Sequence, residues 1–529
     1  MKSKGVVPAT VTQLARKLTA VQKDVAINLV AWAAIIGGAS AWSGSRLGSD
    51  KGTVQTAFVG AVAVSSSVQV ASNVLRAISR SGANVDRQKV ALLAGFGRFR
   101  WCYLGVLAAC NFGEFIQGAF IFNIYDERNG YDVGRIARLF LASTMSAMVT
   151  GMFAGSFLDR YGRRCGCMLW AVLNAVQCLL IRSESLGILV LGRIVAGAGA
   201  TLLATAFESW MVTEHHSRGY SSRSLVDTFR MATWGAGIAT VASGFVGEAA
   251  VKRTGALGPF DVAIGVSLMS FLLLARFWKE NYGDRSFSTR HHTREAFERI
   301  TGDGRLLMIG IVQALFEGSM TTWVMFWVPC LQNAAQGETF GLGTVFSTMT
   351  VSMCGGTSFF KLLTEGLPER LAFSPEACVV LASGVATAAL AIASMDLTPA
   401  MLLLTFLVYE TCIGLYFPAM ATCRSNYIED RVRGTVMNML RVPTNLVVAF
   451  LMIGPMASMS LSMDDKVVVV FGILAALTGV ATVVQVLLLQ RVRELKAEAT
   501  PGQGARPGRK ETGSRSLANI GGREGTGDS

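Results

Sequence analysis

Long apolar segments separated by short charged ones dominate the chain from about residue 100 onward. A helix of about 20 such residues is long enough to cross the hydrocarbon core of a bilayer. Six segments precede a long charged connection and six follow it, at about 101–125, 136–158, 167–181, 186–211, 224–250, 257–278, 306–331, 340–363, 374–395, 398–421, 434–458 and 466–490. The pattern predicts an all-α polytopic membrane protein with two six-helix halves related by an internal repeat.

This pattern predicts five parts: an N-terminal extension (1–97), the first half (98–278), a hinge (279–305), the second half (306–490) and a disordered cytoplasmic tail (491–529). In the extension, the apolar run 25–42 ends in Ala39-Ser40-Ala41, which weakly resembles a signal cleavage site. The basic segment before this run is long for a signal peptide, which favours an extra membrane helix instead. Residues 52–75 carry no charge and fit either a poor membrane helix or an interfacial segment. We therefore expect one or two hydrophobic segments here.

Composition and charge support a membrane location. The 529 residues are 51% hydrophobic and only 16% charged, whereas soluble proteins carry about 25% charged residues. The net charge of +13 comes from basic residues clustered between alternate apolar segments and at the two ends. This pattern places loop 159–164, the hinge and the tail in the cytoplasm, beside anionic lipid, and gives no support to nucleic-acid binding. We expect the plasma membrane, although an intracellular membrane stays open because no targeting signal is clear.

No pattern in the sequence indicates enzyme chemistry. The four histidines form two surface pairs, and no nucleotide-binding loop, Ser-His-Asp order or metal-ligand spacing occurs. We therefore expect no catalytic residue, no cofactor and no metal. The ten cysteines are scattered, mostly inside apolar segments, and fit small buried hydrophobic residues better than a disulfide framework. They are Cys102, Cys110, Cys165, Cys167, Cys178, Cys330, Cys354, Cys378, Cys412 and Cys423.

The segment 191–216 combines small residues with an acid. The run 196–200 (AGAGA) predicts close approach of another helix. Glu208 follows inside the apolar segment, where a carboxylate is costly, so a functional site is one interpretation. The alternative is an interfacial acid capped by water or by Arg218.

Intramembrane charges recur at equivalent places in the two halves. Glu114 in the first segment and Glu317 in the seventh both lie roughly 18–21 Å into their helices. Arg230 in the fifth and Arg441 in the eleventh both lie about 10–12 Å from the cytoplasmic end. The two halves therefore carry a repeated pair of glutamates and a repeated pair of arginines.

A loop between the second and third segments carries a specific motif. Gly155, Asp159, Arg160, Gly162, Arg163 and Arg164 match G-x-x-x-D-R-x-G-R-R. This resembles the loop signature of the major facilitator superfamily, in which the loop forms a latch at the cytoplasmic gate. Physically, Gly162 permits a tight turn, and the charged residues can pair with helix ends and acids. The corresponding loop of the second half, 361–370, lacks the motif.

Four further blocks resemble the molybdate-anion transporter branch of this superfamily. They are Phe207-Glu208-Ser209-Trp210 with Glu214-His215, the block 315–320 (LFEGSM), the block 414–420 (GLYFPAM) with Arg424-Ser425, and the block 433–443 (RGTVMNMLRVP), which contains Asn438. The resemblance covers about residues 98–450. It implies high-affinity uptake of molybdate by a carrier, expected to be a monomer, with tungstate as a competitor. The rival interpretations are a carrier of another anion or small solute, and a non-transporting membrane receptor or scaffold.

The residues themselves agree with an anionic substrate. Transporters with parallel repeats bind substrate near the midplane, between the halves. Arg230 and Arg441 facing one cavity suit a doubly charged tetrahedral oxoanion, because a guanidinium group binds two oxygens at once. The alternative is that they reach toward the interface or pair with an acid, as Arg230 could with Glu208. The predicted substrate site consists of Arg441, Arg230, Glu208 and Asn438.

Three carboxyls are candidates for coupling uptake to protons: Glu114, Glu317 and Glu410. A buried carboxyl can take up and release a proton, but a hydrogen bond between helices is the alternative role. Arg193 lies a turn or two from the outer surface and is expected to extend toward it. Pro443 should remove a backbone hydrogen bond beside Arg441 and leave a helix able to bend.

Overall fold

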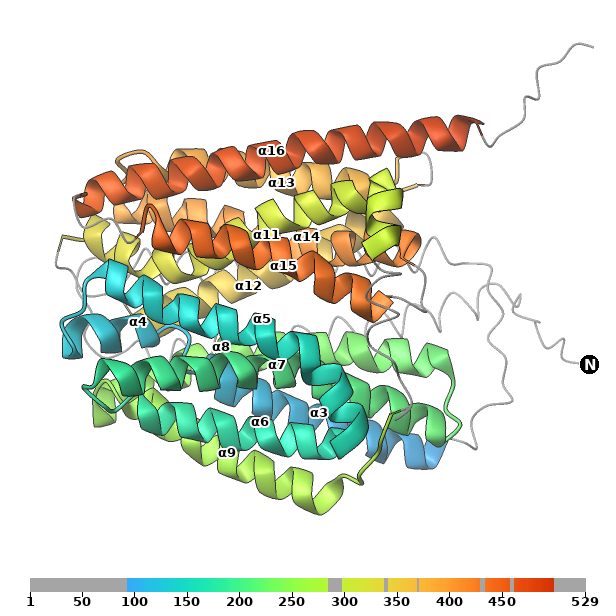
Figure 1. Cartoon of the computed structure of the whole chain (residues 1–529), viewed down its shortest axis with the longest axis horizontal. Coiled ribbons are helices and arrows are strands. Elements are labelled where there is room, and N and C mark those ends of the chain that lie inside the picture. Colours follow the sequence, from blue (N-terminus) through green and yellow to red (C-terminus); the bar gives the residue numbers. More distant parts are fainter. Residues whose placement is uncertain are drawn as a thin grey trace, which may run out of the picture. The chain divides into compact units, whose positions relative to one another are not determined.

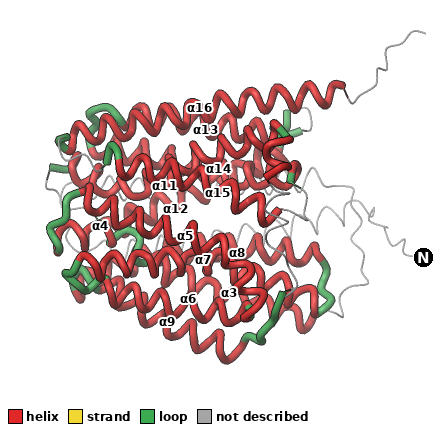
Figure 2. The backbone as a smooth tube through the Cα atoms, viewed as in Figure 1, coloured by secondary structure: helices red, strands yellow, loops and turns green. Residues whose placement is uncertain are grey.

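The computed structural model describes residues 93–283, 297–336, 341–368, 371–428, 433–456 and 461–498. These segments form helices joined by turns and loops, without a strand (Figures 1 and 2). The hydrophobic segments predicted at 25–42 and 52–75 lie outside the described residues, as do residues 284–296 of the hinge and the tail beyond residue 498.

The first half contains six long helices, as predicted. A short helix α4 (Ile121–Asn123) and one π-helical turn (Ile124–Arg128) connect the first two. The six are α3 (Leu93–Phe115), α5 (Val133–Tyr161), α6 (Arg163–Leu180), α7 (Leu186–Ser217), α8 (Ser222–Thr254) and α9 (Gly258–Phe277).

The second half repeats this arrangement with six more helices. They are α11 (Gly304–Ala334), α12 (Leu342–Lys361), α13 (Pro375–Ala393), α14 (Pro399–Tyr427), α15 (Arg433–Ile453) and α16 (Met463–Glu498). A π-helical turn (Leu362–Gly366) extends α12. The predicted fold class is therefore confirmed over the described residues.

Polar side chains at the ends of the preceding loops cap the N-termini of several of these helices. Ser374 and Thr398 each accept a hydrogen bond from a backbone N–H in the first turn of α13 and α14, and proline follows each of them. Asp303 caps α11, and hydrogen bonds from Arg305 hold the pKa of the Asp303 carboxyl below its usual range. These caps satisfy backbone donors that a helix leaves unpaired at its start.

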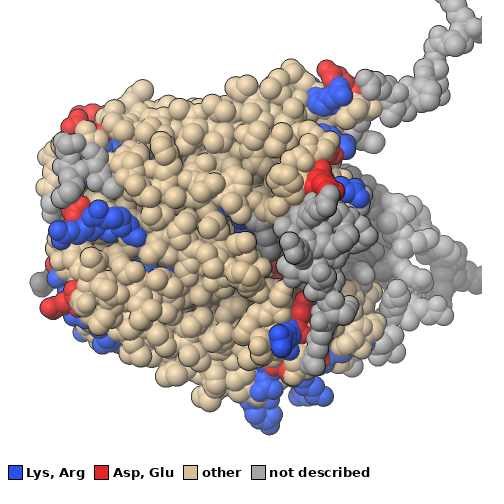
Figure 3. Space-filling model, viewed as in Figure 1, with Lys and Arg blue, Asp and Glu red and all other residues tan. Residues whose placement is uncertain are grey.

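Seven of the described helices are long and apolar enough to cross a membrane by length and composition alone. In the face shown in Figure 3, Lys, Arg, Asp and Glu gather mainly at the two ends of the helices, with uncharged residues covering most of the surface between them. Large apolar side chains are exposed on the described helices, including Leu272, Phe450 and Val483. Such a surface is stable against lipid rather than water.

Small residues set the closest helix contacts, at matching places in the two halves. A Cβ on Gly197 of α7 would overlap the Ser143 carbonyl of α5, and the Thr201 hydroxyl donates to Ala147 O at 3.1 Å. In the second half, a Cβ on Gly414 of α14 would overlap the backbone of α12. The close approach predicted for 196–200 is therefore confirmed, with α5 as the partner helix.

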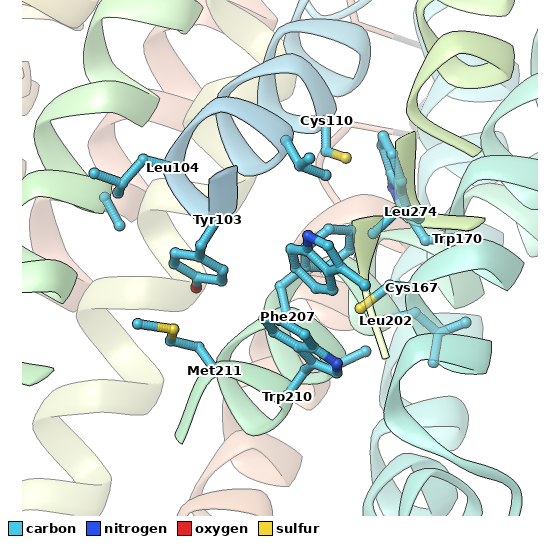
Figure 4. Close-up of a cluster of buried hydrophobic side chains, with 14 of the residues drawn as sticks. Tyr103, Leu104, Cys110, Cys167, Trp170, Leu202, Phe207, Trp210, Met211 and Leu274 are labelled. Atoms are coloured by element: carbon cyan, nitrogen blue, oxygen red, sulfur yellow. The ribbon is translucent and has the colours of Figure 1, made fainter. Parts of the chain in front are cut away.

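An aromatic cluster fills the core of the first half at the predicted cytoplasmic end (Figure 4). Trp210 of α7 stacks on Trp278, with ring centroids 3.7 Å apart, and Phe207 lies edge-on to Trp278. Tyr103 of α3 stacks on both tryptophans. The aromatic residues flanking Glu208 are therefore core residues, and they fix the rotation of α7.

The halves meet where α8 packs on α12 and α5 packs on α15. At the predicted outer end of α8 and α12, Glu248 Oε2 accepts hydrogen bonds from the N–H and hydroxyl of Thr344, at 3.0 and 2.8 Å. The Ser347 hydroxyl donates to Val241 O at 2.8 Å. We call this region the outer seam, made of Val241, Gly244, Glu248, Gly343, Thr344 and Ser347. Because Gly244 and Gly343 have no side chains, the backbones touch and close this end.

Candidate functional site

A buried group of charged and polar side chains occupies the second half. Arg424 Nη1 of α14 donates to two acceptors on α11: Gln313 Oε1 at 2.9 Å and Glu317 Oε1 at 3.3 Å. The Tyr416 hydroxyl also donates to Glu317 Oε1, at 3.4 Å, and its ring stacks on Phe316 at 4.0 Å. The side chains of Arg424 and Glu317 are only 13% and 16% exposed. Solvent therefore reaches this ion pair, but only at its edge.

The position of Arg424 corrects the sequence prediction, which ended this apolar segment at about residue 421, before Arg424. The helix α14 instead continues to Tyr427, because the block that follows Pro418 contains no strong helix breaker. The Arg424 side chain can therefore reach back along α14 to Gln313 and Glu317. Arg424 lies in a block that resembles a transporter family, and this resemblance was the one sequence signal that pointed to a role for Arg424.

Arg441 and Asn438 lie on α15, within the turn that precedes Pro443. The Arg441 side chain is exposed, and it is close enough to act electrostatically on the Glu317 carboxylate. The structure therefore brings together Glu317 and Arg441, which the sequence assigned to separate roles. The Asn438 side chain lies outside the described residues.

The matching arginine of the first half has a different environment. Arg230 of α8 pairs with Asp227 on its own helix at 3.4 Å, and both side chains are about half exposed. The alternative pair between Arg230 and Glu208 is therefore wrong. Glu208 is itself exposed. Its other alternative partner, Arg218, instead binds Glu214 at 2.7 Å.

Glu114 and Arg193 lie in the interior of the first half. Trp170 Nε1 of α6 donates to Glu114 Oε2 at 3.2 Å, which is the predicted alternative of a hydrogen bond between helices. Arg193 is only 9% exposed, so the expectation that it extends to the surface is wrong. Its guanidinium instead lies over the Phe140 ring, 4.8 Å from the centroid, beside a cavity of about 10 Å³ that also borders Gln117.

Glu410 is separate from both groups. It lies on α14, fourteen residues before Arg424, which is about 21 Å along the helix axis. The structure therefore does not bring Glu410 to the ion pair of Arg424 and Glu317. Glu410 directly follows the buried Tyr409 in the sequence.

The predicted cytoplasmic loop forms a set of hydrogen bonds within the first half. Asp159 Oδ1 binds Arg163 Nη2 at 2.8 Å, and Arg163 Nη1 donates to Ser209 O at 3.3 Å. Gly162 has φ of +107°, a conformation that favours glycine and allows the sharp turn between α5 and α6. Arg160 is exposed, and Gly155 has no neighbour within 4 Å of its Cβ position.

Glu280, just after α9, completes this loop and was not among the predicted residues. Its two carboxylate oxygens accept the backbone N–H groups of Arg164 and Cys165, at 2.8 and 3.0 Å. The carboxylate therefore caps the positive end of α6. The Arg164 guanidinium also donates to Ala275 O at 3.2 Å on α9. We call these contacts the cytoplasmic latch, made of Asp159, Gly162, Arg163, Arg164 and Glu280.

Two six-helix halves with buried charges and a cytoplasmic loop of this type define a secondary transporter fold. A family model of the major facilitator type, described as sugar transporters with 12 TM, matches residues 56–414. The chain therefore belongs to the major facilitator superfamily and is a multi-pass membrane transporter rather than an enzyme.

Relatives of known name agree with this assignment. Molybdate-anion transporters of Xenopus tropicalis and Xenopus laevis are each 29% identical, over 65% of this chain and 75% of their own length. The one from Danio rerio is 27% identical, over 66% of this chain and 78% of its own. These matches confirm the resemblance found in the sequence blocks.

Solved structures support the fold independently. A mutant of the nucleoside transporter NupG superposes with a TM-score of 0.60 at 13% identity, covering 73% of this chain and 99% of that one. NupG itself has a TM-score of 0.57 at 12% identity, covering 74% and 98%. At this identity the likeness establishes the fold alone.

Proposed function

We propose that this chain is a secondary active transporter that takes up an oxoanion of the molybdate type by alternating access. The observation that carries the proposal is the ion pair between Arg424 and Glu317 at 3.3 Å, with Arg441 acting electrostatically on the same carboxylate from α15. Two positive charges against one negative charge leave an excess of one positive charge, which favours an anion as the substrate. A neutral sugar would leave this excess uncompensated. The names of the relatives, molybdate-anion transporters, support the same class of substrate.

The proposed substrate site lies between the halves. On the side of the second half it uses Arg441 and Asn438, one turn apart on α15. On the side of the first half it uses Arg230 and Glu208. An exposed ion pair such as that of Arg230 with Asp227 is worth only about 0–1 kcal/mol, so this guanidinium can change partners at little cost.

Alternating access requires contacts that hold each end closed in turn. In this proposal the outer seam closes the outer end, because Glu248 of the first half binds the start of α12 in the second. The cytoplasmic latch orders the other end of the first half around Glu280. A proton is the proposed coupling ion, and the plasma membrane is the expected location.

The test is uptake of labelled molybdate at nanomolar concentration in cells that lack their own system. We expect saturable uptake that tungstate blocks, because it resembles molybdate in size and charge, and that excess sulfate does not. Arg230→Ala combined with Arg441→Ala should abolish uptake while the protein still reaches the membrane. Arg253→Ala, at the exposed end of α8, is the matched control and should transport normally.

Two outcomes would contradict the proposal. If protein shown to be at the cell surface takes up no molybdate, the substrate is another solute, or the chain is a receptor or scaffold. If the double alanine variant transports at the wild-type rate, the assignment of Arg230 and Arg441 to the site is wrong.

A further inference from the structure

We infer that Arg424 is a substrate-binding cation, and that Glu317 occupies it until a proton allows the anion to take its place. This inference rests on the proposed function and names the step that would couple anion uptake to protons. It distinguishes Glu317 from Glu114 and Glu410, the two other candidates for proton coupling, and it assigns Arg424 a direct contact with the anion.

The contacts of Arg424 show that one of its donors is bound to groups on α11. One guanidinium nitrogen, Nη1, donates both to Gln313 Oε1 and to Glu317 Oε1, one turn apart on α11. Arg424 Nε is buried and has no hydrogen-bond partner among the described residues. The guanidinium therefore has a donor to spare, and its one ionic partner in this group is Glu317.

Such a pair is difficult to break by itself. Removing one partner of a buried ion pair is strongly unfavourable, because the other charge remains without compensation. An entering anion competes with Glu317 for the same guanidinium, and two acids at one cation repel each other. Protonation of Glu317 removes this competition. The neutral carboxyl can stay in place, and the positive charge of Arg424 becomes available to the oxoanion.

Three side chains among the described residues act on Glu317. Arg424 and Tyr416 face it from α14, and Arg441 acts on it from α15. All three favour the charged form of this carboxyl, against the effect of its burial. A dianion that binds the two arginines brings negative charge beside Glu317 and takes over the cations that act on it. Anion binding and protonation of Glu317 therefore favour each other.

The cycle balances in charge and in protons. On the side of entry, the Glu317 carboxylate accepts one proton from water, Arg424 keeps its charge, and the oxoanion binds to the guanidinium. On the side of release, the anion leaves, Glu317 gives its proton to water, and the ion pair with Arg424 forms again. Glu317 thus carries one proton for each anion.

The two other carboxyls lack this arrangement. The hydrogen-bond donor to Glu114 is the neutral indole of Trp170, and Arg193 acts on it without a direct ion pair, so protonation of Glu114 would break no ion pair. Glu410 lies about 21 Å from Arg424 along α14. Neither carboxyl holds an arginine in a direct ion pair among the described residues.

The experiment is equilibrium binding of labelled molybdate to the purified full-length chain between about pH 6 and about pH 8. Tungstate, sulfate and phosphate serve as alternative probes. We expect the wild type to bind more tightly as the pH falls. Glu317→Gln should bind at every pH at least as tightly as the wild type does at the lowest pH, with no dependence on pH. Arg424→Gln should weaken binding at least about tenfold throughout.

The controls separate this role from a structural one. Glu114→Gln and Glu410→Gln should keep the pH dependence of the wild type. Glu494→Gln removes an exposed ion pair with Arg491 and should change nothing. Reconstituted into liposomes, Glu317→Gln should lose accumulation driven by a proton gradient but retain exchange of anion for anion.

The results separate failure of the inference from failure of the proposed function. If none of the four anions binds to the wild type, both fall. If one binds but Glu317→Gln keeps the pH dependence, or Arg424→Gln binds normally, the function stands and the inference is wrong. Loss of the pH dependence in Glu114→Gln or Glu410→Gln alone would also overturn it.

Discussion

The outer seam offers a direct test of the conformational cycle through Glu248→Ala. The Glu248 side chain is 8% exposed and accepts two hydrogen bonds from Thr344 across the two halves. A hydrogen bond to a charged group contributes about 1.5–3 kcal/mol, and loss of a helix cap costs about 0.5–2 kcal/mol. Because the cap is one of these same bonds, the closed seam should lose about 2–5 kcal/mol. The population open to the outside should then rise by roughly 30-fold to 5,000-fold.

A thiol introduced by Ser347→Cys reports this opening, because Ser347 is completely buried in the closed seam. The exposed Cys102 and Cys165 are replaced by serine in the same background. The measurement is the rate of alkylation by a membrane-impermeant reagent added outside intact cells. When opening is fast and labelling slow, this rate follows the open population. Glu248→Ala should therefore accelerate labelling by at least about 30-fold.

Lys252→Ala is the matched control. Lys252 contacts the other oxygen of Glu248 at 2.7 Å, but it is 42% exposed and lies on the same helix. An exposed pair of this kind contributes about 0–1 kcal/mol, so labelling should change by less than about fivefold. Equal labelling rates in Glu248→Ala and the parent would refute the role of this carboxylate in closing the seam.

Two further predictions concern glycines. Gly162→Ala should lower transport and the melting temperature. The φ of +107° at this position is strained for alanine, and the added Cβ would overlap the Glu280 carboxylate. Normal activity and stability of this variant would show that the cytoplasmic latch is dispensable. Gly197→Leu should prevent folding, measured as loss of monodisperse protein in detergent, because its side chain would enter the Ser143 carbonyl, whereas Gly155→Ala meets open space and should fold normally.

Sequence reasoning succeeded where the structure depends on local patterns. The spacing of apolar segments predicted the two six-helix halves, because any helix in lipid must satisfy its own backbone and cover about 30 Å. The motif at 155–164 predicted a tight turn at Gly162 and charged residues that pair with helix ends and neighbouring acids, and Arg163 does pair with Asp159. The small residues at 196–200 predicted the close contact that α7 makes with α5.

It failed where the partner of a side chain depends on how helices are rotated. The repeat suggested equivalent roles for Arg230 and Arg441, but Arg230 meets Asp227 and only Arg441 acts on Glu317. Arg193, expected at the surface, is buried over Phe140. Equal depth along two helices does not place two side chains on facing sides, since a rotation of one residue turns a side chain by about 100°.

The sequence by itself therefore determined the class of protein, the approximate positions of its described helices, and the site of its cytoplasmic loop. Each of these follows from hydrophobicity and backbone geometry within one stretch of chain. Only the tertiary structure decided that Arg424 pairs with Glu317 and that Glu280 caps α6. Both contacts join residues more than 100 positions apart, and their formation depends on packing of whole helices that no local pattern encodes.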